Sequence, residues 1–170
     1  TVHIENTRFD DTPNWAFHLQ GTAVSGDPEY QRLIGCWFGP NNGRSIITHS
    51  GPTTNPRPEI INCLFESSNA IQIRSNVLID GCYFTNARDA TSNSALVATI
   101  ESEPFEVTLR NCIFAPKHDV LPYIDLRLEG VTTTIANCQF YHQGSGALLA
   151  LGRGPANVTT IDNCLFYVRP

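Results

Sequence analysis

The sequence lacks several features that would suggest a function directly. It has no methionine, and charged residues fill only 16% of its 170 positions, which is low for an ordinary globular surface. Its 11 lysines and arginines are not clustered, so the basic footprint of a nucleic-acid-binding protein is missing. No apolar run approaches the roughly 18 residues that a membrane-spanning helix requires. We therefore expect neither nucleic acid nor a membrane as a partner.

Motifs for metal, cofactor and nucleophile chemistry are also missing. The cysteines form no Cys-x-x-Cys pair, and the histidines show neither His-x-His nor His-Glu-x-x-His spacing. There is no glycine-rich loop of the kind that cradles phosphate, and no nucleophile elbow. The sequence therefore predicts no metal site and no cofactor.

A short motif recurs seven times along the chain. It reads apolar residue, any residue, Asn or Gly, usually Cys, any residue, Phe. The copies are residues 4–9, 33–38, 60–65, 79–84, 109–114, 135–140 and 161–166. The intervals vary, and the shortest, from Cys63 to Cys82, has room for three short strands but not for a crossover helix. One common unit with variable insertions indicates a solenoid.

The Asn or Gly of each copy marks a change in side-chain phase. Alternate residues of a strand share one face, so the first apolar residue and the Asn or Gly lie on the same side. The Cys and the Phe, two positions apart, must nevertheless both point inward. Asn and Gly tolerate the left-handed αL conformation, which would reset the phase at a corner. Each unit therefore predicts a strand, an αL corner and a short second strand.

A third strand is expected after each corner, and stacked units would then align equivalent side chains about 4.8 Å apart. The expected third strands are residues 16–19, 45–48, 70–73, 95–100, 123–128 and 147–151. One inward cysteine per unit indicates free, structural thiols. Disulfides between neighbouring units, or metal binding, are the alternatives that the spacing leaves open.

The Asn/Gly-Cys-x-Phe units resemble those of the pectate-lyase-like right-handed β-helix superfamily, over nearly the whole chain. The resemblance implies an all-β, right-handed parallel β-helix, a single-stranded solenoid of about seven coils formed by residues 1–170. That superfamily includes polysaccharide lyases, glycoside hydrolases, bacteriophage tailspikes and bacterial surface proteins, so the fold alone does not select a function. It does imply a host or environmental polysaccharide as the partner.

Two features of the units concern assembly. Neither end shows a polar capping unit or an amphipathic helix, so we expect a domain within a longer chain, or ends covered by neighbours. The residue between Cys and Phe should face outward and is large and apolar in most units, which marks a contact surface. This column is Arg8, Trp37, Leu64, Tyr83, Ile113, Gln139 and Leu165. Since tailspike-like β-helices pack as parallel trimers, the resemblance implies a homotrimer; long loops folding back over the column are the alternative.

Outward positions of the third strand supply the candidates for chemistry. A glycoside hydrolase needs two carboxyl groups and a lyase needs a base with a neutralising cation. Glu101 and Asp125 are the predicted acid/base pair. The predicted polysaccharide-binding residues are His49, Gln72, Arg74 and Arg127, with Trp15 and Tyr123 as aromatic platforms.

Three functions are consistent with these features. The first is a virion tailspike or tail-fibre-like β-helix that binds host-surface polysaccharide, located on a virion or outside the cell and assembled with other virion proteins. Unpaired cysteines fit its assembly in a reducing cytosol. The second is a secreted polysaccharide lyase or glycoside hydrolase, and the third is a structural surface or filament protein. Whether the chain is an enzyme is left open by the sequence.

Overall fold

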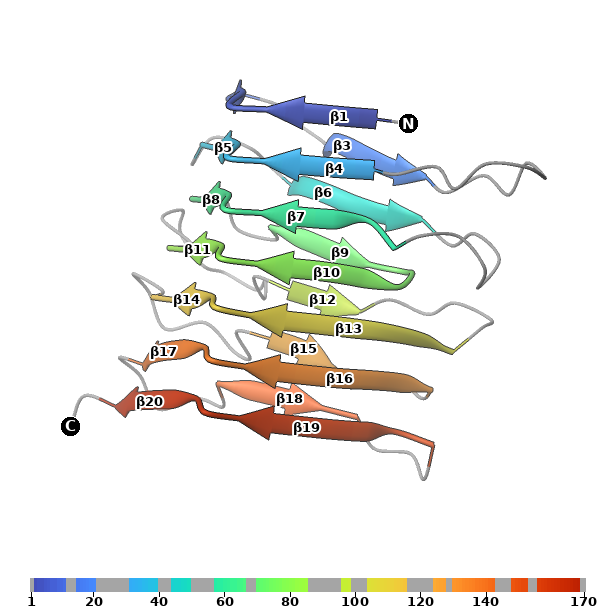
Figure 1. Cartoon of the computed structure of the whole chain (residues 1–170), viewed down its shortest axis with the longest axis vertical. Coiled ribbons are helices and arrows are strands. Elements are labelled where there is room, and N and C mark those ends of the chain that lie inside the picture. The colour runs from blue at the N-terminus through green and yellow to red at the C-terminus, as the bar shows by residue number, and fades with distance from the viewer. Residues whose placement is uncertain are drawn as a thin grey trace.

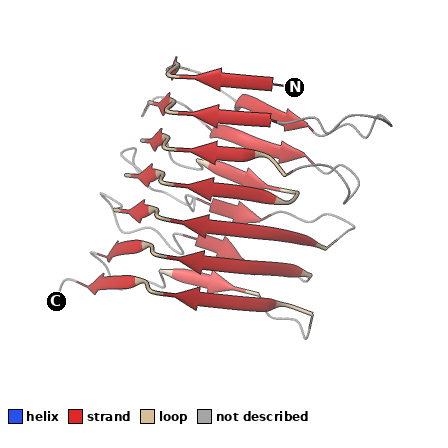
Figure 2. Cartoon of the chain, viewed as in Figure 1, coloured by secondary structure: helices blue, strands red, loops and turns tan. Residues whose placement is uncertain are grey.

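The chain folds into a parallel β-solenoid. The computed structural model describes residues 2–11, 15–20, 31–39, 44–49, 57–66, 70–85, 96–98, 104–115, 124–127, 130–142, 148–152 and 156–168. Within these residues the strands stack along one axis, from β1 at one end to β20 at the other (Figure 1). Figure 2 shows strands and turns but no helix in this part of the chain. The expected all-β solenoid is thereby confirmed.

Three parallel sheets run along the solenoid. Sheet A has seven strands: β1 (Val2–Glu5), β4 (Gln31–Ile34), β7 (Glu59–Ile61), β10 (Val77–Asp80), β13 (Phe105–Arg110), β16 (Val131–Ala136) and β19 (Val158–Asp162). Sheet B has seven: β2 (Arg8–Phe9), β5 (Trp37–Phe38), β8 (Leu64–Phe65), β11 (Tyr83–Phe84), β14 (Ile113–Phe114), β17 (Gln139–His142) and β20 (Leu165–Val168). Sheet C has six: β3 (Trp15–Gln20), β6 (Arg44–His49), β9 (Ile71–Ile73), β12 (Leu96–Ala98), β15 (Ile124–Leu126) and β18 (Leu149–Leu151). Each motif copy therefore supplies one strand to sheet A and one to sheet B.

The corner between sheets A and B is left-handed in every unit. The corner residues are Asn6, Gly35, Asn62, Gly81, Asn111, Asn137 and Asn163, and their φ angles lie between 47° and 64°. This confirms the predicted αL corner. At the second corner the glycine leaves room for the asparagine side chain of the unit before: a Cβ on Gly35 would lie 2.6 Å from Oδ1 of Asn6.

Backbone hydrogen bonds across the corners join neighbouring units in both directions. The corner amide donates forward, as from Asn6 to the Ile34 carbonyl at 2.9 Å. One residue after the cysteine the amide donates backward, as from Trp37 to the Thr7 carbonyl at 3.0 Å. The same two bonds recur unit after unit, so the αL kink leaves the ladder unbroken.

Phenylalanine rings form a continuous stack inside the solenoid. The stack is Phe9, Phe38, Phe65, Phe84, Phe114, Phe140 and Phe166, with neighbouring ring centroids between 4.8 and 5.0 Å apart and nearly parallel planes. The five rings from Phe38 to Phe140 are fully buried. Ring spacing equals strand spacing because each ring projects from the same position of a parallel ladder.

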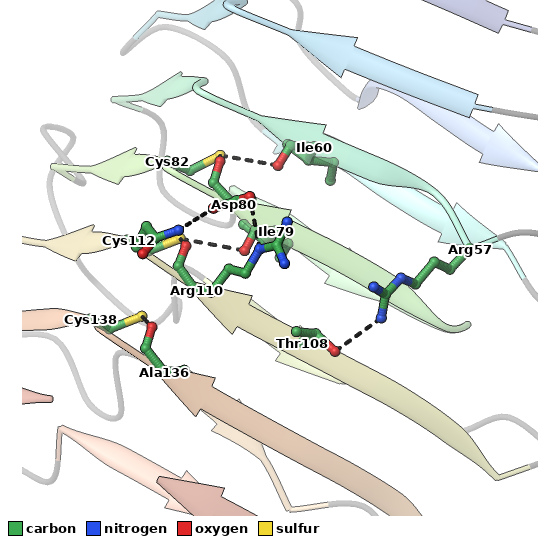
Figure 3. Close-up of polar contacts among 11 residues, drawn as sticks. Arg57, Ile60, Ile79, Asp80, Cys82, Thr108, Arg110, Cys112, Ala136 and Cys138 are labelled. Atoms are coloured by element: carbon green, nitrogen blue, oxygen red, sulfur yellow. Dashed lines mark hydrogen bonds and ion pairs between the residues drawn. The ribbon is translucent and has the colours of Figure 1, made fainter. Parts of the chain in front are cut away.

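Cysteine thiols form a second interior column. All six cysteines are free, as expected for structural thiols, and five of them are buried. Each sulfur lies near backbone carbonyl oxygens at the corner, as Cys82 Sγ does at 3.4 Å from the Ile60 oxygen (Figure 3). In the first unit Thr7 takes the cysteine position and donates from Oγ1 to the Glu5 carbonyl at 2.9 Å. The position after the corner residue therefore holds a small side chain, Thr or Cys, whose hydroxyl or thiol donates to a backbone carbonyl oxygen.

Interior positions of the last unit are open to solvent. Phe166 is 44% exposed although its other face stacks on Phe140, and Ile161 is also 44% exposed. Stacking shields an interior side chain only when a unit lies on both sides of it.

Candidate functional site

Those residues predicted for binding or catalysis that the structure describes lie on sheet C or directly after its strands. Gln72 and Asp125 occupy the same outward row, because both pair with Val97, which lies on the strand between them. They are two strands apart, or roughly 10 Å along the axis. Their neighbours Ile73 and Ile124 are fully buried, which confirms that Gln72 and Asp125 face outward.

Three more of the predicted residues lie at the ends of sheet C strands. His49 ends β6, and Arg74 and Arg127 each follow the last residue of their strand. The Arg74 amide donates to Thr48 Oγ1 at 2.9 Å, which fixes it beside β6. His49 and Arg74 therefore lie at the ends of two neighbouring strands of sheet C, β6 and β9. Trp15 begins β3, at the opposite end of the strands from His49.

Asp125 is engaged by a cation from its own strand. Arg127 donates from Nε to Oδ1 at 2.7 Å and from Nη2 to Oδ2 at 2.6 Å. Its hydrogen bonds to Asp125 raise the pKa of the exposed Arg127 guanidinium. Since both carboxylate oxygens accept hydrogen bonds from one guanidinium, Asp125 is poorly placed to act as a general base.

The predicted pair of Glu101 and Asp125 cannot be measured as a distance, since Glu101 lies outside the described residues. Tyr123 also lies outside them, as do the side chains of Trp15 and His49. The register does show that Asp125 lies opposite Val97, four positions before Glu101 in the sequence.

The outer face of sheet A carries a second set of polar side chains, which the sequence analysis missed. Thr108, Thr134 and Thr160 occupy one outward row of neighbouring strands. Glu106 and Thr132 occupy the row beside it. The signal was present in the alternation of β13 and β16, whose burial changes at every residue. A period of two predicts such rows on any half-buried strand.

Ion pairs between units cover part of this face. Arg32 Nε lies 2.6 Å from Glu59 Oε2, and Arg110 Nε donates to Asp80 Oδ2 at 2.8 Å. The corner residue Asn111 donates from Nδ2 to Asp80 Oδ1 at 2.8 Å. Figure 3 shows the contact of Arg110 with Asp80 and that of Arg57 with Thr108, whose Oγ1 lies 3.2 Å from Arg57 Nη1. These contacts join outward side chains of different units of the solenoid.

A cavity of about 270 Å³ opens where β10, β13 and β16 begin. It is lined by Asn76, Pro104, Phe105, Glu106, Gly130 and Thr132, from three successive units. Asn76 Oδ1 accepts a hydrogen bond from the backbone amide of Glu106 at 2.7 Å, which fixes the two units to each other. Gly130 has a φ of 80°, so the chain turns sharply into β16 at the cavity wall. The lining combines hydroxyl, amide and carboxylate groups with the exposed ring of Pro104, so the cavity offers several hydrogen-bonding partners to a polar ligand.

Two other kinds of site find no support in the described part of the chain. No group of three or more His, Cys, Asp or Glu side chains there could hold a metal ion. No helix among those residues is long and apolar enough to cross a membrane. Cys82 is shielded from solvent, and burial is the main cause that raises the pKa of its thiol well above the usual value.

Comparison with known proteins does not extend this picture. No family model matches the chain, and no match was found among curated proteins or among solved structures. The class that the fold defines is the parallel β-solenoid.

Proposed function

We propose that this chain is the β-solenoid part of a virion tailspike or tail-fibre-like protein that binds host-surface polysaccharide along the outer face of sheet A. The observation that carries the proposal is the in-register row of threonine hydroxyls on that face beside the cavity at Glu106 and Thr132. A polysaccharide is itself a linear repeat of hydroxyl groups. Hydrogen-bonding side chains repeated along a rigid rod therefore suit it as a ligand.

Binding is favoured over catalysis by the state of the predicted acid/base residue. Asp125 is paired through both oxygens with Arg127. A polysaccharide lyase or glycoside hydrolase needs a carboxyl group that is free to exchange a proton with the sugar. Release of reducing sugar or of unsaturated uronate from candidate polysaccharides would favour the enzyme instead.

The binding face is tested with Thr132→Tyr, which places a phenol in the cavity. Its matched control is Glu5→Tyr, which adds the same ring to an exposed position of sheet A outside both the threonine row and the cavity. We expect Thr132→Tyr to weaken binding to a surface-polysaccharide panel by at least about tenfold, or 1.4 kcal/mol, and Glu5→Tyr to leave it unchanged. If the unmodified protein binds no member of the panel, the chain is a structural surface or filament protein.

The outward column of sheet B supports the proposed homotrimer. Its residues pair in register from Arg8 to Leu165, and Tyr83 and Leu165 are 41% and 53% exposed. Trp37 is partly covered within its own chain, because the Arg8 guanidinium lies 3.8 Å from its ring centroid. Contact between copies would bury the remaining apolar side chains.

Light scattering tests this assembly directly. We expect a mass near three times the 18.8 kDa of one chain, and a monomer for Tyr83→Lys. Glu5→Lys on sheet A is the control, since it adds the same side chain away from the column and should stay trimeric. A monomeric unmodified protein would contradict the trimer.

A further inference from the structure

The cavity on sheet A has an unbalanced charge. Glu106, at its edge, is exposed and carries the one carboxylate among the six lining residues, and none of the six is a cation. The other lining groups are the Asn76 amide, the Thr132 hydroxyl, Gly130 and the apolar surfaces of Pro104 and Phe105. A ligand in this cavity therefore meets hydrogen-bonding groups and one negative charge.

Two arginines of the same face are neutralised by carboxylates, since Arg32 is paired with Glu59 and Arg110 is paired with Asp80. Arg57 donates to Thr108 Oγ1 at 3.2 Å and is not one of the residues that line the cavity. The chain as a whole carries a formal charge of −5. A glycan that carries carboxylates would therefore be repelled both by Glu106 at short range and by the protein at long range.

We infer that the cavity takes an uncharged segment of polysaccharide and discriminates against uronate-containing chains. This inference rests on the proposed polysaccharide binding and adds the substrate class. The Glu106 carboxylate accepts hydrogen bonds from sugar hydroxyls, as the Thr132 hydroxyl can, while the ring of a neutral sugar packs on the exposed Pro104. A C6 carboxylate brought to the same place meets a like charge with no neighbouring cation in the lining.

The test uses a panel of neutral hexose oligosaccharides and the same oligosaccharides oxidised at C6 to uronates. Each pair shares its linkages and differs only at C6, where the hydroxymethyl group of the neutral sugar is replaced by a charged carboxylate. By calorimetry at low ionic strength we expect the neutral member to bind at least about fivefold more tightly, a preference that shrinks at high salt. Glu106→Gln removes the charge and keeps the shape, so the preference should fall toward unity.

Glu5→Gln is the control for net charge. It makes the same change on sheet A, but in the first unit, away from the cavity. The preference should persist in this variant. Equal or tighter binding of the uronates by the unmodified protein overturns the inference, as does a preference that Glu106→Gln leaves intact. Failure to bind any oligosaccharide would instead overturn the proposed function itself.

Discussion

Replacing Gly81 by alanine tests the left-handed corner in the middle of the solenoid. Gly81 has a φ of 64°, and a Cβ added there would collide with Oδ1 of Asn62. Holding an L-residue in the αL region costs about 1–2 kcal/mol. Moving the Asn62 amide aside adds about 1 kcal/mol or less, because it is the flexible end of a side chain. We therefore expect Gly81→Ala to lower the free energy of unfolding by about 1–3 kcal/mol.

Urea unfolding followed by circular dichroism measures this loss. With a denaturant slope of about 2 kcal/mol/M, the midpoint should fall by roughly 0.5–1.5 M. Asn62→Gly keeps an αL-compatible residue at its own corner and should change stability by less than about 0.5 kcal/mol. In the Asn62→Gly background, Gly81→Ala no longer collides with the Asn62 side chain and costs only the strain of an L-residue in the αL region. The effects of the two substitutions on the free energy of unfolding should therefore be non-additive. An unchanged midpoint for Gly81→Ala would refute the corner geometry.

Three further predictions follow from the interior columns. Phe84→Ala, which removes a fully buried ring stacked on both sides, should cost about 3–5 kcal/mol in urea unfolding; a loss below 1 kcal/mol would contradict the stack. In the native protein Cys164, the one thiol that is not buried, should react with a maleimide first and Cys82 only after unfolding, as peptide mapping by mass spectrometry would show. The pKa of Cys82 is raised by burial above its ordinary 9.0, so its stabilising contribution is complete below pH 9 and is lost as pH rises beyond it. Measured relative to Cys82→Ala, the urea midpoint of the unmodified protein should fall between pH 8 and pH 10, and a rise would contradict this sign.

Interior features were predictable because they repeat. Seven copies of one motif fix which side chains share an environment, and the αL preference of Asn and Gly fixes where the chain turns. The third strands were found too, although less sharply: β12 comprises Leu96–Ala98, inside the longer range expected from the sequence. Alternation there is weaker, since no corner residue limits the strand on either side.

Surface features were less predictable because outward side chains carry no such constraint. The pairing of Asp125 with Arg127 joins two residues that are two positions apart in the chain, and that spacing alone does not tell which outward side chains pair. The catalytic role of Asp125 stays a prediction. The cavity was missed because it depends on where β10, β13 and β16 start, which varies with the insertions between units. The sequence of one unit does not show where its first strand starts relative to the first strand of the next unit.

Anomalous scattering from sulfur tests the solenoid most directly. The chain has no methionine, so its six cysteines are the only sulfur atoms in the protein. In a crystal measured at long wavelength, the anomalous difference map should show six peaks in a nearly straight row, with neighbours about 4.8 Å apart. Peaks scattered through the molecule, or fused in pairs at the roughly 2 Å of a disulfide, would contradict the account.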